Sequence, residues 1–240
     1  MPCQLTFDVF MDIPASAALK PDEIERIETW IFDLDNTLYP ASSRLFDQIS
    51  RNMTRFIMKH LDLDWDAAYR TQKSFFREHG TTMRGLMTNH GTDPLEFLDF
   101  VHEIDLSPIA PNPDLDAALD RLDGRKVIFT NGSTDHAANI TRHLGIDHHF
   151  DATFDIVDSD YTPKPDPGVY TKMTTELKIN PDTAIMFEDM ARNLVPAANM
   201  GMTTVWVRTE VDWGIEGSDG DHIDHIVDDL AKWLGRLVGE

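Results

Sequence analysis

The segment WIFDLDNTLY (residues 30–39) places two aspartates, Asp33 and Asp35, directly after a short apolar run. A short apolar run that ends in polar residues is typical of a strand buried on both faces of a sheet. Similar runs follow at residues 127–129, 184–187 and 204–207, and a weaker one at 152–157. The sequence therefore predicts a set of short interior strands.

Helix-like patterns separate these runs, at residues 113–122, 136–144 and 168–177. Alternating strands and helices predict a parallel sheet with helices on both sides, a Rossmann-like three-layer α/β/α core. The carboxyl ends of parallel strands meet at one edge, where ligands bind. Each polar residue after a strand could simply cap the next helix. Together, however, we expect these to line one crevice: Asp33, Asp35, Thr130, Asn131, Glu188 and Asp189.

A long insert separates the first strand from the second. An ordinary crossover needs only about a dozen residues, and apolar spacing predicts helices here at 43–60, 64–79 and 94–104. The aromatic residues expected in the core of the cap are Trp65, Tyr69, Phe75 and Phe76. Three prolines at 108–113 mark the return linker. We predict an N-terminal arm at 1–27 with a short helix from Pro21, an α/β core at 28–40 plus 111–240, and a helical cap domain at 41–110.

The charge of the chain restricts its partners. The 240 residues include 21 Lys and Arg against 42 Asp and Glu, for a net charge of −21. A field of this sign repels phosphate backbones, so a nucleic-acid polymer is a poor partner. A small anionic substrate would require a bound cation or a local positive cluster. The acidity has an alternative explanation in solubility or adaptation to salt.

The single cysteine, Cys3, cannot form an intramolecular disulfide and fits a reducing compartment. No stretch approaches the roughly 18 apolar residues of a transmembrane helix. Residues 1–16 lack the basic start and continuous apolar run of a signal peptide. We expect a cytoplasmic protein with no membrane partner, and the oligomeric state stays open.

Four motifs resemble those of the haloacid dehalogenase-like (HAD) hydrolase superfamily. They are Asp33-Leu34-Asp35-Asn36-Thr37, Phe129-Thr130-Asn131-Gly132, Lys164 before a proline, and Glu188-Asp189 with Asn193. The resemblance covers residues 30–207. It implies the same core with a cap between the first two motifs, and a phosphomonoester as the small-molecule substrate.

The chemistry of these residue types gives each aspartate a role. A carboxylate such as Asp33 can attack phosphorus and form an aspartyl-phosphate intermediate. Asp35 can protonate the leaving oxygen and then deprotonate the attacking water. Because Mg²⁺ prefers oxygen ligands, it can be held by Asp33, the backbone carbonyl of Asp35, and Asp189.

The remaining motif residues complete the predicted site. The Thr130 hydroxyl and the backbone amides beside Asn131 suit phosphoryl oxygens, and Lys164 adds positive charge. Glu188 is expected beside the metal ligands rather than among them, and Asn193 to hold a metal-bound water. Outside this context, Thr130 could cap a helix and Lys164 could be a surface lysine.

Asp35 favours phosphoryl transfer over dehalogenation, since halide leaves without a proton and the dehalogenases lack this carboxylate. A phosphomutase and a non-catalytic binding protein remain alternatives. Several segments resemble the pyrimidine 5′-nucleotidase branch, which implies UMP or CMP as substrate, with phosphoglycolate-type acids or sugars as the alternative. The candidates to contact a base or ribose are in the cap: Thr81, Thr82, Arg84, Asn89 and His90.

Two histidine pairs lie outside these motifs. His222 and His225, with neighbouring aspartates, fit one turn of a polar surface helix. His148 and His149 have no cysteine or other partner at ligand spacing. The sequence predicts no metal site at either pair.

Overall fold

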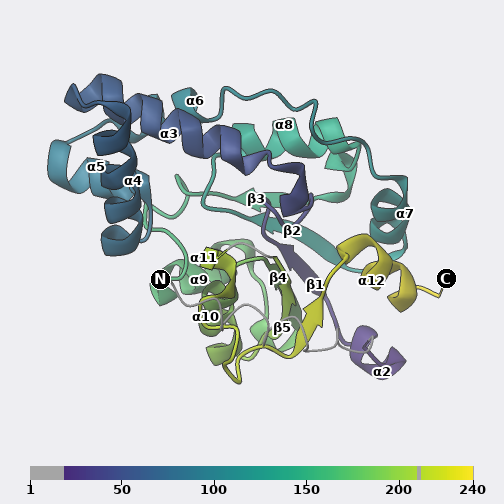
Figure 1. The fold of residues 1–240 in the computed structure, drawn as a ribbon. Coiled ribbons are helices and arrows are strands. Elements are labelled where there is room, and N and C mark those ends of the chain that lie inside the picture. The colour runs from purple at the N-terminus through teal and green to yellow at the C-terminus, as the bar shows by residue number, and fades with distance from the viewer. Residues whose placement is uncertain (1–18, 210–211, 240) are drawn as a thin grey trace.

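The computed structural model describes residues 19–209 and 212–239, which form a parallel sheet with helices around it (Figure 1). The sheet order is β3-β2-β1-β4-β5-β6, and every neighbouring pair is parallel. The predicted parallel α/β sheet is therefore confirmed. The strands are β1 (Thr29–Phe32), β2 (Arg125–Phe129), β3 (Ala152–Phe154), β4 (Ala184–Glu188), β5 (Thr203–Val207) and β6 (His225–Val227).

Helices cover both faces of the sheet. Successive side chains of each strand point to opposite faces, so apolar residues lie on both sides. Trp30 and Phe32 of β1 belong to one buried cluster, whereas Ile31 between them belongs to another. The first cluster includes residues of α7 (Pro113–Arg121), α8 (Thr134–Leu144) and α12 (Leu230–Leu237). The second includes residues of α9 (Pro167–Leu177) and α10 (Leu194–Asn199). The core is thus the expected three-layer sandwich.

The insert after β1 forms four helices, which stand together beside the sheet in Figure 1. They are α3 (Phe46–Leu61), α4 (Trp65–His79), α5 (Thr82–His90) and α6 (Pro94–Val101), and α5 is an additional helix that the apolar spacing did not predict. Asp64, Thr81 and Asp93 cap the N-termini of α4, α5 and α6 with their side chains. The four helices share a core of their own, which includes Ile57, Leu86 and Val101.

The segment around His225 is a strand, so the interpretation as a helical turn is wrong. His225 begins β6, which pairs with β5. The Asp224 carboxylate accepts hydrogen bonds from the backbone N and the hydroxyl of Thr204, at 2.8 and 3.0 Å. His222 Nε2 lies 2.9 Å from the carbonyl oxygen of Ala191. These contacts fasten the segment that leads into β6 to the rest of the core.

The strand predicted at 152–157 is shorter than expected and ends at Phe154. The next residue, Asp155, turns the chain. Its Oδ1 accepts hydrogen bonds from the backbone N of Val157 and of Asp158, and its Oδ2 accepts one from the backbone N of Thr134 at 2.7 Å. Local side-chain hydrogen bonds of this kind compete with strand pairing.

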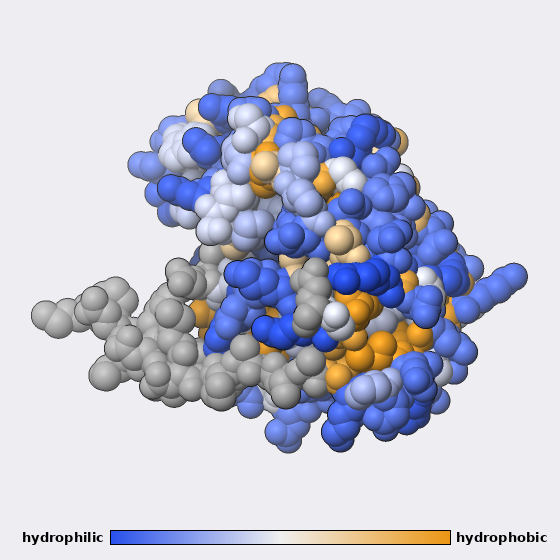
Figure 2. All heavy atoms as spheres, turned by 90° about the vertical axis from the view of Figure 1, so that its right-hand side faces the viewer, coloured by the Kyte–Doolittle hydropathy of each residue, from blue (hydrophilic) through white to orange (hydrophobic). Residues whose placement is uncertain are grey.

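The predicted N-terminal arm, residues 1–27, lies largely outside the described residues, as does Cys3. Its described part contains the short helix expected at Pro21, α2 (Pro21–Ile24). The remaining short elements are η1 (Ala41–Ser43), η2 (Asp147–His149), η3 (Pro181–Thr183), η4 (Ala191–Asn193) and α11 (Asp212–Ile215). Within 19–209 and 212–239, no helix combines the length and apolar character needed to cross a membrane. Hydrophilic residues cover most of the face drawn in Figure 2.

Phe187 of β4 provides a test of the packing close to the carboxyl ends of the strands. Its ring is fully buried, stacks on Phe32 at 4.8 Å between centroids, and meets Trp233 edge-on at 5.7 Å. Phe187→Ala should lower the free energy of unfolding by about 3–5 kcal/mol, because it leaves a cavity in a close-packed core. Urea unfolding followed by circular dichroism measures the change. Leu95→Ala is the control, since Leu95 is 52% exposed and its loss should change stability by about 0.5 kcal/mol or less.

Candidate active site

The carboxyl ends of three adjacent strands bring the motif residues together. In the sheet, β1 lies between β2 and β4. Asp33 follows β1, Thr130 follows β2, and Glu188 ends β4. All six polar residues from the strand ends line one cavity of about 790 Å³, whose other walls come from the cap helices and α11: Asp33, Asp35, Thr130, Asn131, Glu188 and Asp189.

Lys164 stands at the centre of this cluster. Its side chain is 1% exposed, and its ammonium donates hydrogen bonds to Asp33 Oδ1 at 2.8 Å, Glu188 Oε2 at 2.6 Å and the carbonyl oxygen of Phe129 at 2.8 Å. These three bonds use all three donors of the ammonium group. The Asn131 side chain holds the backbone of the same lysine, because its Oδ1 accepts a hydrogen bond from Lys164 N at 2.8 Å. Lys164 is therefore fixed at both ends.

One lysine does not offset all the acidic groups here. Burial, followed by the negative charge of Glu188, raises the pKa of Asp33 from 3.8 to about 7 despite the opposing charge of Lys164. Burial and the charges of Glu188 and Asp33 raise the pKa of Asp189 well above its usual range. Burial alone would lower the pKa of Lys164, but Asp33 and Glu188 raise it above its ordinary value. The site is short of positive charge.

The donor set fits a divalent metal ion. One carboxylate oxygen from each of Asp33, Glu188 and Asp189 lies within 4.8 Å of the others. Asp189 Oδ2 and Asn193 Oδ1 are buried, and no hydrogen-bond partner for either lies among the described residues. Buried polar atoms normally have a partner, and oxygen-rich sites suit hard dications. The cluster is thus chemically suited to a hard cation.

Asp35 has a different environment from Asp33, two residues away. Tyr39 donates its hydroxyl hydrogen to Asp35 Oδ1 at 2.5 Å, and His136 Nε2 lies 2.9 Å from the same oxygen. Burial alone would raise the pKa of Asp35, but His136 and Tyr39 together lower it. The other carboxylate oxygen, Oδ2, is the one that remains for a ligand.

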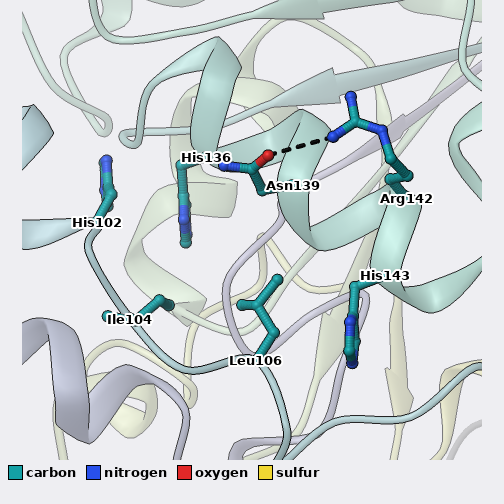
Figure 3. A pocket seen from close by; sticks show the side chains of 7 residues that line it. All are labelled: His102, Ile104, Leu106, His136, Asn139, Arg142 and His143. Carbon is teal, nitrogen blue, oxygen red and sulfur yellow. Dashed lines mark hydrogen bonds between the residues drawn. The ribbon is translucent and has the colours of Figure 1, made fainter.

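His136 is held by a second histidine. His102, which follows α6, stacks on it with ring centroids 4.1 Å apart and planes 7° apart, and Figure 3 shows the two rings side by side in a smaller cavity of about 340 Å³. Burial lowers the pKa of His102 to about 3, so that ring is neutral. The sequence patterns did not identify Tyr39 and His136 as partners of Asp35, or His102 as the ring stacked on His136. The available signals were Tyr39, two residues after the first motif, and His136 in the first turn of the helix after the second motif.

The cap candidates divide into two groups. Thr81 and Thr82 line the large cavity, although the Thr81 hydroxyl also caps α5 by accepting a hydrogen bond from Arg84 N. Arg84, Asn89 and His90 are not among its lining residues. Asn89 instead donates to the carbonyl oxygen of Gly85 at 2.9 Å, which ties it to its own helix.

The cap wall of the cavity comes largely from α3 and α4, and the residues of α4 include its aromatic and basic side chains. Tyr69, Lys73, Phe76 and Arg77 line it, and Trp213 of α11 faces them from the core. Lys73 Nζ lies 5.2 Å from the ring centroid of Tyr69 and 5.9 Å from that of Trp213. The assignment of Trp65 and Tyr69 to the cap core is wrong, since they are 40% and 45% exposed and Tyr69 borders the cavity, whereas Phe75 is buried as expected. Helical spacing identified the aromatic face but not the cavity that it borders.

Comparison with known proteins gives one family match. Residues 27–201 match the model of a hydrolase family described as haloacid dehalogenase-like hydrolase. Phosphate metabolism protein 8 of Saccharomyces cerevisiae is 27% identical over 198 residues, covering 76% of this chain. The match spans only 62% of the yeast protein. Glyceraldehyde 3-phosphate phosphatase of Methanopyrus kandleri is 26% identical over 232 residues, covering 89% of this chain and 98% of that protein.

Solved structures show the same fold. A HAD phosphatase from Thermococcus onnurineus superposes with a TM-score of 0.58 at 18% identity, covering 89% of this chain and 98% of that one. L-2-haloacid dehalogenase from Xanthobacter autotrophicus gives a TM-score of 0.55 at 18% identity, covering 88% and 98%. Because both kinds of enzyme share the fold, the choice between them depends on the site.

The raised pKa of Asp33 predicts how stability changes with pH in the absence of metal. Between its unfolded value near 3.8 and its folded value of about 7, the unfolded chain releases this proton and the folded chain retains it. The unfolded state then binds fewer protons, so stability should fall as pH rises through this interval. The change should amount to a few kcal/mol at most, since one pKa unit corresponds to about 1.4 kcal/mol.

Urea unfolding across this pH interval, with a chelator present, measures the effect. Asp33→Asn removes the titrating group and should make the decline distinctly shallower than in the unmodified protein. Equal slopes for the two proteins would contradict the assignment of this shift to Asp33.

Proposed function

The chain belongs to the haloacid dehalogenase-like hydrolase family, and we propose that it is a metal-dependent phosphomonoester hydrolase. The observation that carries the proposal is the pairing of Lys164 with Asp33 at 2.8 Å in the cavity that also contains Asp35, held by Tyr39 and His136. A fixed carboxylate nucleophile and a separate carboxylate for proton transfer are what the hydrolysis of a phosphomonoester requires.

The two aspartates divide the reaction. Asp33 attacks phosphorus and forms an aspartyl-phosphate, while Asp35 protonates the departing oxygen through its Oδ2. For this step Asp35 has to carry a proton, against the lowering of its pKa by His136 and Tyr39. Asp35 then accepts a proton from the water that hydrolyses the intermediate. Lys164 keeps Asp33 in place and offsets charge on the transferred group. Thr130 and the backbone amides beside Asn131 receive the phosphoryl oxygens.

The cation in this proposal is Mg²⁺. Asp33, Asp189 and the backbone carbonyl of Asp35 would hold it, and the buried oxygen of Asn193 would fix one of its waters. Glu188 supports the site through its hydrogen bond with Lys164. When bound, Mg²⁺ supplies the positive charge that the carboxylates and a substrate phosphate lack.

Asp35 favours a phosphatase over a dehalogenase, because only an oxygen leaving group needs a proton. Two relatives carry names that fit this choice, one a glyceraldehyde 3-phosphate phosphatase and the other a phosphate metabolism protein. We place the helices of residues 41–110 as the lid over the site. A cytoplasmic location is part of the proposal and is supported by the single cysteine.

For the substrate, we favour a pyrimidine nucleoside monophosphate. The cavity of about 790 Å³ exceeds the needs of a triose phosphate, and its aromatic wall suits a planar base. Lys73 lies between the rings of Tyr69 and Trp213, where it can donate to the carbonyl oxygens of a base. A small phosphorylated sugar or acid is the second candidate, favoured by the name of the Methanopyrus kandleri relative.

Replacement of the nucleophile tests the reaction. Asp33→Asn should reduce Mg²⁺-dependent phosphate release from an aryl phosphate by at least about a thousandfold, as expected when the group that forms the covalent intermediate is lost. Asp66→Asn, an exposed change on α4, should keep full activity. Substantial turnover by a folded Asp33→Asn protein would refute the mechanism. Transfer of phosphate between positions of a sugar, without release, would instead identify a mutase.

A substrate panel tests the specificity. We expect higher kcat/KM for UMP and CMP than for AMP, phosphoglycolate, glyceraldehyde 3-phosphate or a hexose phosphate. Trp213→Ala should lower kcat/KM for UMP by about tenfold, because stacking of a base on an aromatic ring contributes about 1–3 kcal/mol. The same variant should leave phosphoglycolate hydrolysis nearly unchanged. Equal losses for both substrates, or a preference for the triose phosphate, would reject the nucleotidase assignment.

A further inference from the structure

A second group of side chains that can bind a metal lies outside the cap, on elements of the α/β core domain that do not carry the carboxylate cluster. It comprises Asp116 on α7 and the adjacent residues His148 and His149 in η2. His149 Nε2 lies 2.7 Å from Asp116 Oδ1, and His148 Nε2 lies 3.4 Å from the same oxygen. One ligand atom from each residue lies within 4.8 Å of the other two.

The two rings converge although their backbone geometry separates them. In a 3₁₀ helix, three residues complete a turn, so neighbouring side chains point about 120° apart. Here the rings of His148 and His149 approach to 4.0 Å between centroids, and both direct Nε2 to one oxygen. A single hydrogen bond between His149 and Asp116 explains the position of one ring. It does not explain why the second ring turns to the same oxygen.

The exposure of the three side chains suits an accessible metal site. The side chain of His149 is 6% exposed and forms the buried side of the group. The side chains of His148 and Asp116, 60% and 43% exposed, form the side that faces solvent. Ligand atoms around a tetrahedral ion, at about 2.0–2.1 Å from it, are separated by about 3.3 Å. The 3.4 Å separation of His148 Nε2 from Asp116 Oδ1 matches that value, whereas His149 Nε2, now hydrogen-bonded at 2.7 Å, would have to move away by about 0.6 Å. Water could supply the fourth ligand from the side that faces solvent.

We propose that Asp116, His148 and His149 bind a transition-metal dication of the Zn²⁺ class. Two imidazole nitrogens and one carboxylate oxygen suit Zn²⁺, Co²⁺ or Ni²⁺, whereas Mg²⁺ prefers oxygen ligands alone. The two groups of residues thus differ in the cation that they select, since the cluster of Asp33, Glu188 and Asp189 offers only oxygen. The net charge of −21 favours the approach of any cation.

A metal at this position would cross-link two parts of the core. Asp116 belongs to the first helix after the cap, and this helix packs against α12. His148 and His149 precede β3, an edge strand of only three residues. The three ligands are brought together only in the folded chain, so the ion would bind the folded state in preference to the unfolded state. It would therefore stabilise the attachment of β3 to the rest of the sheet.

The test uses the full chain in excess Mg²⁺, so that the oxygen-only cluster is occupied before Zn²⁺ is added by isothermal titration calorimetry. We expect one Zn²⁺ per chain to bind, and His148→Gln and Asp116→Asn to weaken its affinity by at least about tenfold each. Even partners outside the ligand set contribute about 10–100-fold to metal affinity. Co²⁺ absorption in the visible range should report the same site and lose intensity in both variants.

Two control variants make the same kinds of substitution, Asp to Asn and His to Gln, at residues outside the proposed zinc site. Asp120→Asn changes an exposed carboxylate one turn along α7, and His143→Gln changes a histidine whose Nε2 contacts the carbonyl oxygen of Ile109. Both should bind Zn²⁺ as the unmodified protein does. Because His148 is 60% exposed, His148→Gln should fold normally. In the absence of zinc, its unfolding temperature should equal that of the unmodified protein. Added Zn²⁺ should then raise the unfolding temperature of the unmodified protein and of the two controls more than that of His148→Gln.

The outcomes separate this site from the active site. Absence of zinc binding in excess Mg²⁺ would overturn the proposal, as would binding that His148→Gln and Asp116→Asn leave unchanged. Zinc binding lost in Asp33→Asn but retained in His148→Gln would also overturn it, because the ion would then occupy the carboxylate cluster. The result does not depend on phosphatase activity, and failure of the proposed function would leave this test intact.

Discussion

The buried ammonium of Lys164 is the interaction on which the site depends. It binds carboxylates from two different strands, Asp33 after β1 and Glu188 at the end of β4, and it is itself anchored on β2 through the carbonyl oxygen of Phe129. Without this charge, two buried carboxylates would repel each other at the centre of the sheet, and uncompensated buried charge is strongly destabilising. One side chain therefore joins the ends of three strands and sets the place where chemistry can occur.

The topology explains why these strand ends are neighbours. β1 lies between β2 and β4 in the sheet, so residues from positions 33, 130 and 188 meet although they are far apart in sequence. The cap is inserted immediately after β1, which places its helix α4 over the same edge. The core thus supplies the charged cluster, and the insert supplies much of the remaining cavity wall. In the proposed enzyme, changes in that wall would alter the substrate without disturbing the charge network.

Sequence patterns predicted strands β1 to β5 and the polar residues that meet at one cavity, because both are local signals. Apolar runs that end in Asp or Thr-Asn identify strands and their functional ends, and Lys164 precedes a proline in a recognisable motif. The partners of Asp35 were missed because they depend on packing: His136 lies on a helix whose pattern indicates a buried face but not which carboxylate it meets. β6 was missed for a similar reason, since its three residues carry no alternation and exist as a strand only through pairing with β5.

The opposite environments of Asp33 and Asp35 give the proposed metal requirement a physical basis. The pKa of Asp33 is raised to about 7 by burial beside Glu188, whereas that of Asp35 is lowered by His136 and Tyr39. A nucleophile has to be ionised, yet the metal-free site opposes ionisation of the residue in the nucleophile's position. A dication held by Asp33 and Asp189 would reverse that balance, because positive charge favours the ionised form of both carboxylates. In the proposed mechanism, metal binding would thus increase the fraction of Asp33 that is ionised and couple the metal to the first chemical step.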